Sequence, residues 1–115
     1  MTVIQSLKGD RAFGRLRRGR AGHAKFLSLR WRAVREDGVR VGIVVSKKVG
    51  KAVVRNRVRR RLREALRATL LRAETGRKDA FAFEVVIIAR PESAEADYWQ
   101  LEGALEHALR KGQAL

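Results

Sequence analysis

The segment NRVRRRLREALRATLLR, residues 56–72, carries the clearest helical periodicity of the chain. When its residues are placed at 100° intervals, one sector is apolar and holds Val58, Leu62, Ala65, Leu66 and Thr69. The opposite sector is polar and cationic and holds Asn56, Arg59, Arg60, Arg63 and Arg67. We therefore predict a helix from Arg57 to about Arg72 that packs one face on a core and presents arginines on the other.

The residues at the start of the chain predict a short helix followed by a loop. Asp10 can cap a helix over residues 11–18, in which Ala12, Phe13 and Leu16 share one side. Gly19 can end this helix in the left-handed conformation. Residues 20–25 are then expected to form a loop.

Two segments of strand composition follow, over residues 26–34 and 39–46. Between them, Glu36-Asp37-Gly38 suits a tight turn, so we expect the two strands to pair as an antiparallel hairpin. Residues 52–55 can add a short third strand, after which Asn56 caps the long helix.

The last third of the chain predicts one central strand and one helix. The uninterrupted apolar run from Val85 to Ala89 is typical of a strand that is buried on both faces, so we expect a strand over residues 81–89. The final helix is expected to begin at Asp97, with Gln100 at the third helical position of a capping box.

This order of elements, α-β-β-β-α-β-α, predicts an α/β (α+β) fold. We expect a two-layer sandwich in which two long helices cover a mixed sheet of about four strands. No repeat and no linker composition divides the chain, so residues 1–115 are expected to form a single domain.

The charge of the chain is strongly unbalanced, because 27 Lys and Arg face 12 Asp and Glu and give a formal net charge of +15. A chain with this excess repels itself when compact, which favours a polyanionic partner that neutralises it. No apolar run is long enough to cross a bilayer, so we expect nucleic acid and no membrane. No apolar stretch of signal-peptide length lies in residues 1–8, which favours a cytoplasmic protein.

The side chains that usually hold metals or perform catalysis are scarce or scattered. The chain has no cysteine and only two histidines, His23 and His107, so metal clusters of these residues are not expected. Four acidic residues of the second half could suggest a metal-dependent nuclease, namely Glu84, Glu92, Glu95 and Asp97, but they fall at a strand start, in a loop and at a helix cap. We therefore expect no catalytic residue and no metal held by the protein.

Cations are concentrated between Lys47 and Arg72, where 11 of the 27 fall and Glu64 is the only acid. The planar fork of donors on arginine can hold phosphate oxygens bidentately and stack on bases, which suits RNA. A merely solvated helix face is the alternative interpretation, but such faces normally mix charges for pairing at i,i+4.

The run SKKVGKAVVRNRVRRRLRE, residues 46–64, resembles the signature of the bacterial ribonuclease P protein component, including its Arg-Asn-Arg core. Leu7, Phe13, Val41-Gly42 and residues 87–90 agree with that family in order and spacing, so the resemblance covers nearly the whole chain. It implies an α/β sandwich with a left-handed crossover between parallel strands, a connection that handedness rules alone would reject.

The resemblance also implies a function. Such a protein is the subunit of ribonuclease P that binds the catalytic RNA and the 5′ leader of precursor tRNA, and it assists endonucleolytic removal of the leader. The RNA, with Mg²⁺ at its active site, is expected to carry the catalysis.

Two groups of site residues follow from the resemblance and the cationic pattern. The expected RNA contacts are Lys47, Lys48, Lys51, Arg55, Asn56, Arg57, Arg59, Arg60, Arg63 and Arg67. Asn56 has a second interpretation as the helix cap, and both roles can hold together.

The expected leader-binding cleft contains Phe13, Arg17, Leu29 and Trp31. Phe13 matches the family pattern, although plain core packing is an alternative for it. Arg17 stands where an aromatic residue is frequent, and Leu29 and Trp31 stand near a strand position often held by tyrosine. For Trp31 and for Trp99, core packing is the favoured interpretation.

Three other functions stay open at this point. A structural or ribosomal RNA-binding protein explains the charge and the fold equally well. A DNA-binding module could insert the arginine helix into a major groove, although no helix-turn-helix pattern precedes it. A stand-alone nuclease is the third.

Overall fold

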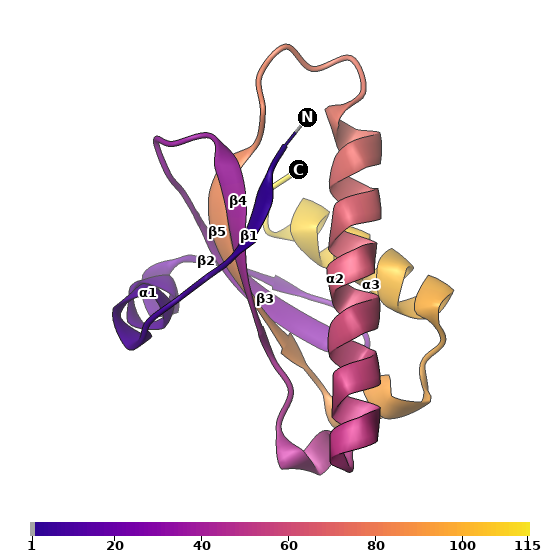
Figure 1. Cartoon of the computed structure of the whole chain (residues 1–115). Coiled ribbons are helices and arrows are strands. Elements are labelled where there is room, and N and C mark those ends of the chain that lie inside the picture. The colour runs from indigo at the N-terminus through magenta and orange to yellow at the C-terminus, as the bar shows by residue number, and fades with distance from the viewer. Residues whose placement is uncertain (1) are drawn as a thin grey trace.

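The computed structural model describes residues 2–115 and shows a five-stranded mixed sheet with two long helices on one of its faces (Figure 1). Along the chain the elements are β1 (Ile4–Ser6), α1 (Asp10–Arg15), the 3-10 turn η1 (Leu16–Arg18), β2 (Arg20–His23), β3 (Leu27–Ala33), β4 (Gly38–Val44), the 3-10 turn η2 (Lys47–Val49), α2 (Ala52–Glu74), β5 (Ala82–Ala89), the 3-10 turn η3 (Pro91–Glu95) and α3 (Tyr98–Lys111). The predicted two-layer sandwich is confirmed, with five strands in place of about four.

The sheet has the order β1-β4-β5-β3-β2. β4 is parallel to β1 and to β5, whereas β3 is antiparallel to β5 and to β2. Helix α2 connects the parallel neighbours β4 and β5. In Figure 1 both strands run downward, β4 is nearer the viewer and α2 lies to their right, so this crossover is left-handed. The handedness that the family resemblance implied is therefore present.

The main core lies between the sheet and the helices α2 and α3. All the predicted apolar positions of α2 are fully buried, namely Val58, Leu62, Ala65, Leu66 and Thr69. The start of α3 is also as predicted: the Asp97 carboxylate accepts from the Gln100 amide at 2.8 Å, and the Gln100 side chain accepts from the Asp97 amide at 2.9 Å. The helical periodicity and the capping box are both confirmed.

The predicted hairpin is wrong, because β3 and β4 do not pair with each other. β5 lies between them and pairs with both. The turn after β3 passes over the end of β5, where the Val34 amide donates to the Ala82 carbonyl at 3.1 Å and the Gly38 amide donates to the Phe81 carbonyl at 2.7 Å. The apolar run of β5 explains this insertion, since the central place in a sheet buries a strand most completely.

Residues 52–55 are helical, so the predicted third strand is also wrong. α2 begins at Ala52 after Lys51, which is the N-cap residue, and Asn56 therefore lies inside the helix and does not cap it. The side chain of Asn56 instead accepts a hydrogen bond from Arg59 at 3.1 Å. The valines of this segment have lower helix propensity than leucine or alanine, a weak preference that tertiary context overrides.

The remaining differences lie near the start of the chain. β1 and the four-residue β2 were not expected, and β2 occupies part of the predicted loop 20–25. The helical segment ends at Arg18 as expected, but Gly19 is extended, with φ −73° and ψ 173°, because it leads directly into β2.

Candidate nucleic-acid interface

A group of cations without acidic partners occupies one end of the molecule. The group, here called the cationic end, lies on η2 and the first half of α2 and consists of Lys47, Lys48, Lys51, Arg55, Arg57, Arg59, Arg60, Arg61 and Arg63. Within residues 2–115, none of these side chains forms an ion pair. Their charge is therefore available to an external anion.

Some of these arginines are held in place by the protein backbone. Arg57 donates to the Ala94 carbonyl at 3.3 Å and Arg61 donates to the Ala96 carbonyl at 2.8 Å, which ties α2 to the η3 region. Arg60 and Arg63 differ, because both are exposed and neither forms a hydrogen bond to another side chain or to a carbonyl in the described chain. These two are the free arginines at the middle of the row.

The second half of α2 is different, because its arginines are neutralised within the protein. Arg67 pairs with Glu64 at 3.3 Å, and Arg72 pairs with Glu102 at 2.6 Å and with Glu106 at 3.3 Å. The hydrogen bond that Arg72 donates to the Glu106 carboxylate raises the pKa of Arg72 above its ordinary value. Arg67 and Glu64 are both exposed, and such a pair contributes little. Because this pair is weak, it does not prevent Arg67 from contacting RNA, and that contact stays a prediction.

The start of α2 adds to the positive potential of the cationic end. The first amides of a helix have no internal partner and carry the positive end of its dipole. The first turn of α2 contains no acidic residue that would offset it. Phosphate groups of a polyanion would thus meet guanidinium groups, ammonium groups and backbone amides at the same place.

A second surface lies on the face of the sheet opposite α2 and α3, where α1 covers only a part (Figure 1). Phe13 of α1 is half-buried there against a small cluster formed by Leu7, Ala12, Leu16 and Val86. Val44 and Ile88 are neighbours across β4 and β5 and stay 40% and 42% exposed. This surface, here called the open face, combines an aromatic ring with an uncovered apolar strip.

Two arginines flank the open face. Arg30 points to this side of β3 and donates to the carbonyls of Arg17 at 3.2 Å and Gly19 at 3.3 Å. Arg17 itself is exposed at the end of α1 and η1. The sequence interpretation missed Arg30, although the alternation of side chains along a strand places it on the face opposite Leu29.

Leu29 and Trp31 do not share a surface with Phe13. Leu29 is 1% exposed in the main core, and Trp31 lies on the same side of β3, with its indole N–H donating to the Gly112 carbonyl at 2.7 Å. Their placement in a leader-binding cleft is therefore wrong, and the predicted core packing of Trp31 is confirmed. For Trp99 the core interpretation is wrong, since that side chain is 73% exposed.

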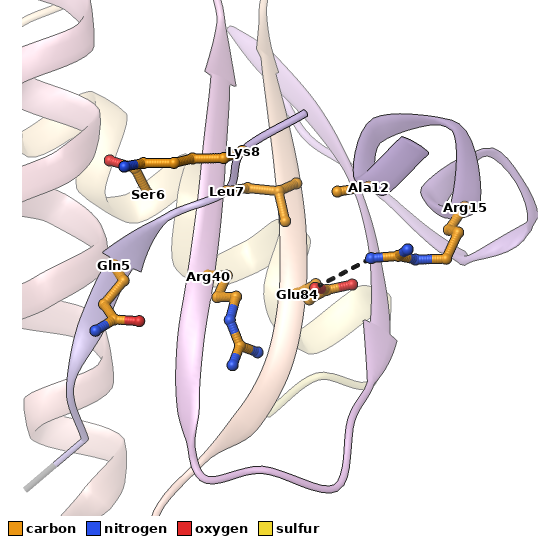
Figure 2. A pocket seen from close by; sticks show the side chains of 8 residues that line it. All are labelled: Gln5, Ser6, Leu7, Lys8, Ala12, Arg15, Arg40 and Glu84. Carbon is orange, nitrogen blue, oxygen red and sulfur yellow. Dashed lines mark ion pairs between the residues drawn. The ribbon is translucent and has the colours of Figure 1, made fainter. Parts of the chain in front are cut away.

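A pocket of about 690 Å³ opens beside α1 (Figure 2). Glu84, only 4% exposed, lies in it and pairs with Arg32 at 2.9 Å and with Arg15 at 3.7 Å, while Lys8 and Arg40 also line it. Sequence reasoning gave Glu84 no role, because a single carboxylate at a strand start has no distinctive pattern. Its charge offsets nearby arginines, so this side of α1 attracts phosphate less than the cationic end does.

The contact between Phe13 and β4 depends on the lack of a side chain at Gly42. A Cβ atom at position 42 would lie 2.6 Å from Cζ of Phe13, so Gly42→Ala is expected to push the ring away and to lower the free energy of unfolding by about 1 kcal/mol. Gly14→Ala in α1 is the matched control, because nothing lies within 4 Å of its Cβ position. Chemical denaturation of both variants checks this, and equal stability of the two would contradict it.

The described residues also lack two other kinds of site. Over residues 2–115, no helix combines the length and the apolar composition needed to span a bilayer. In the same part of the chain, no three His, Cys, Asp or Glu side chains gather where they could hold a metal ion.

Fold and surface together define a small basic α/β protein with a cationic end and a partly apolar open face. A family model described as Ribonuclease P matches residues 1–113, so the chain belongs to the ribonuclease P protein family. The "Ribonuclease P protein component" of Thermus thermophilus is 52% identical over 108 residues, which are 94% of this chain and 60% of that protein. The chain thus spans about 60% of the length of this curated relative.

Solved structures agree with this assignment. The RNase P protein of Staphylococcus aureus superposes with a TM-score of 0.73 at 26% identity, covering 96% of this chain and 94% of that one. The RNase P protein of Thermotoga maritima, in complex with 1-(4-fluorophenyl)-2-thiourea, gives a TM-score of 0.70 at 29% identity over 86% of this chain and 92% of that one. The family resemblance inferred from residues 46–64 is confirmed.

Proposed function

We propose that this chain binds the RNA subunit of ribonuclease P through the cationic end and assists removal of the 5′ leader from precursor tRNA. The observation that carries the proposal is the contrast along α2. Arginines of its second half are paired with carboxylates, whereas those of its first half, together with the lysines of η2, have no acidic partner within residues 2–115. An unpaired row of this kind fits the closely spaced phosphates of folded RNA.

The 5′ leader is proposed to lie on the open face. A single strand exposes its bases, which stack on aromatic rings and on guanidinium planes. Phe13 offers a ring, Arg17 and Arg30 offer guanidinium groups, and the exposed Val44 and Ile88 offer an apolar floor. This surface would hold the leader while the cationic end holds the RNA subunit.

The chemistry of cleavage is assigned to the RNA. Phosphodiester hydrolysis needs an activated water and a stabilised leaving oxygen, which metal ions commonly supply. The described residues offer no set of carboxylates that fits Mg²⁺, so we expect the RNA to hold it and derive no protein step through the metal. The protein, working in the cytoplasm, would increase the affinity for substrate and lower the magnesium concentration that the RNA requires.

Reconstituted cleavage at low magnesium tests this function. The protein is expected to stimulate cleavage of precursor tRNA by the ribonuclease P RNA, and more so when the substrate carries a leader.

Phe13→Ala is expected to reduce the leader-dependent part of the substrate affinity by about fivefold to a hundredfold, the range for loss of one stacked base.

The same assay, together with a binding competition between duplex DNA and leader-bearing tRNA, separates the other functions. RNA binding without stimulation of cleavage would favour a structural or ribosomal RNA-binding protein. Preference for duplex DNA over leader-bearing tRNA would favour a DNA-binding module. Cleavage by the protein alone, without RNA, would favour a stand-alone nuclease.

A further inference from the structure

We propose that the surface around Trp99 is a second RNA-binding site, which takes one unpaired nucleotide by stacking its base on the indole. The site, here called the Trp99 surface, consists of Lys25, Phe26, Trp99, Gln100, Gly103 and His107. Trp99 is 73% exposed, whereas the indole of Trp31 is half-buried and hydrogen-bonded to Gly112. Neither the cationic end nor the open face accounts for an exposed indole on α3.

The spacing of residues along α3 leaves room beside the indole. Trp99, Gly103 and His107 follow at intervals of four residues, so they share one side of the helix. The Cβ position of Gly103 has nothing within 4 Å. Trp99 and His107 are therefore separated along the helix by about 12 Å, at 1.5 Å per residue, with no side chain of Gly103 between them.

The hollow has a volume of about 450 Å³, and its other wall is the turn before β3. Phe26 in that turn has a φ of 75°, a conformation uncommon for a bulky residue. The turn is fixed by hydrogen bonds from the Ala24 amide to the Leu27 carbonyl at 3.1 Å and from the Arg90 amide to the Phe26 carbonyl at 2.8 Å. The wall that faces Trp99 is thus held in place before any ligand arrives.

The side chains around the hollow match the parts of a nucleotide. The exposed indole offers a stacking face, and the side-chain NH2 of Gln100, whose oxygen accepts from the Asp97 amide, and the His107 ring offer hydrogen-bonding groups for a base edge. The Lys25 ammonium lies 5.2 Å from the Phe26 ring centroid and can meet a phosphate. Among the described residues, no carboxylate lines the hollow.

A polyanion fits this surface better than a second copy of the chain. The net charge of +15 opposes association of two copies, whereas it favours RNA. α3, which carries Trp99, lies on the opposite side of the sheet from α1 (Figure 1). The choice of RNA as ligand rests on the proposed function, but the site is separate from both surfaces used there.

The variant Gly103→Leu tests the site by filling the hollow. Leucine has higher helix propensity than glycine, so the variant is expected to be at least as stable as the wild type. The measurement is tryptophan emission during titration with a six-nucleotide single-stranded oligoadenylate. The wild type is expected to show quenching, and Gly103→Leu is expected to shift its midpoint by at least about fivefold to higher concentration.

Two control variants identify the source of the signal. Trp99→Phe should remove the quenching, because the remaining Trp31 is half-buried and hydrogen-bonded. Arg60→Ala with Arg63→Ala should keep the quenching while it weakens binding of the ribonuclease P RNA. That pair separates failure of the Trp99 surface from failure of the proposed function.

Two outcomes would overturn the inference. The first is Trp99 emission that stays constant at saturating oligoadenylate while the ribonuclease P RNA still binds. The second is self-association in sedimentation velocity that Gly103→Leu abolishes, without any response to oligoadenylate, which would assign the surface to a second copy of the chain.

Discussion

Replacing Arg60 and Arg63 together by alanine is expected to weaken binding of the ribonuclease P RNA by tenfold or more. Both side chains are exposed and unpaired within the described chain, so each is free to form a charge-assisted hydrogen bond to phosphate. Such a bond contributes about 1.5–3 kcal/mol, and loss of one already corresponds to about a tenfold change. The free energy of unfolding is expected to change by no more than about 0.5 kcal/mol.

The salt dependence of binding provides a second measurement on the same variant. For each RNA phosphate that the variant no longer neutralises, the slope of log affinity against log salt should become shallower by about 0.7–0.9. Arg35→Ala with Lys78→Ala is the control, because it removes the same charge from the loops at the other end of the molecule (Figure 1). Equal losses of affinity from the two pairs would mean that net charge, and not the cationic end, determines binding.

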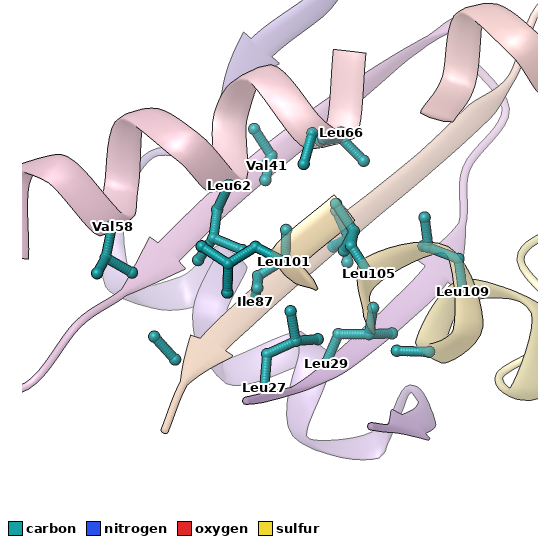
Figure 3. Close-up of a cluster of buried hydrophobic side chains, with 14 of the residues drawn as sticks. Leu27, Leu29, Val41, Val58, Leu62, Leu66, Ile87, Leu101, Leu105 and Leu109 are labelled. Carbon is teal, nitrogen blue, oxygen red and sulfur yellow. The ribbon is translucent and has the colours of Figure 1, made fainter. Parts of the chain in front are cut away.

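Leu62→Ala is expected to have the opposite effect, a large loss of stability, with the side chains of the cationic end left unchanged. Leu62 is fully buried, and Figure 3 shows it pointing from α2 toward Ile87 of β5 and Leu101 of α3. Truncation of a buried leucine leaves a cavity and lowers the free energy of unfolding by about 2–5 kcal/mol. Denaturant unfolding followed by circular dichroism measures this loss.

Leu71→Ala is the matched control on the same helix. Leu71 is 54% exposed, so its truncation is expected to change the free energy of unfolding by about 0.5 kcal/mol or less. Similar losses from Leu62→Ala and Leu71→Ala would mean that the helix packs on the sheet through a different face.

The sequence was sufficient to predict those elements whose pattern lies within one continuous segment of the chain. The 3.6-residue period of α2 identified its buried face, and the apolar run of β5 identified a central strand, because each pattern extends over many residues. The capping box at Asp97 and Gln100 needs only four residues and one geometry, so it was predicted as well.

The errors concern pairing and burial that depend on distant parts of the chain. An Asp-Gly turn indicates a hairpin, but nothing in residues 26–46 shows that β5, about 40 residues later, enters between the two strands. The predicted helix began at Arg57, whereas α2 begins at Ala52. The difference arises because the valines of this segment are compatible with both a strand and a helix.

The candidate site was predictable in part for the same reasons. The cationic end lies on one continuous segment, so a resemblance over residues 46–64 could locate it. The open face joins α1 to three strands, and the sequence analysis grouped Leu29 and Trp31 with Phe13 although they lie on the opposite side of the sheet. Since side chains alternate along a strand, such an error moves a residue to the wrong side of the sheet.

The parallel pairing of β4 with β5 brings the segments that follow these strands, η2 and η3, to the same end of the sheet. Arg57 and Arg61 then join that end of α2 to backbone carbonyls more than 30 residues away. During synthesis, the charged residues of the cationic end are therefore present before the carbonyls of Ala94 and Ala96, which hold Arg57 and Arg61 in place. RNA that binds only the folded protein shifts the folding equilibrium toward the folded state. We therefore expect the proposed binding of RNA and the folding of this chain to proceed together.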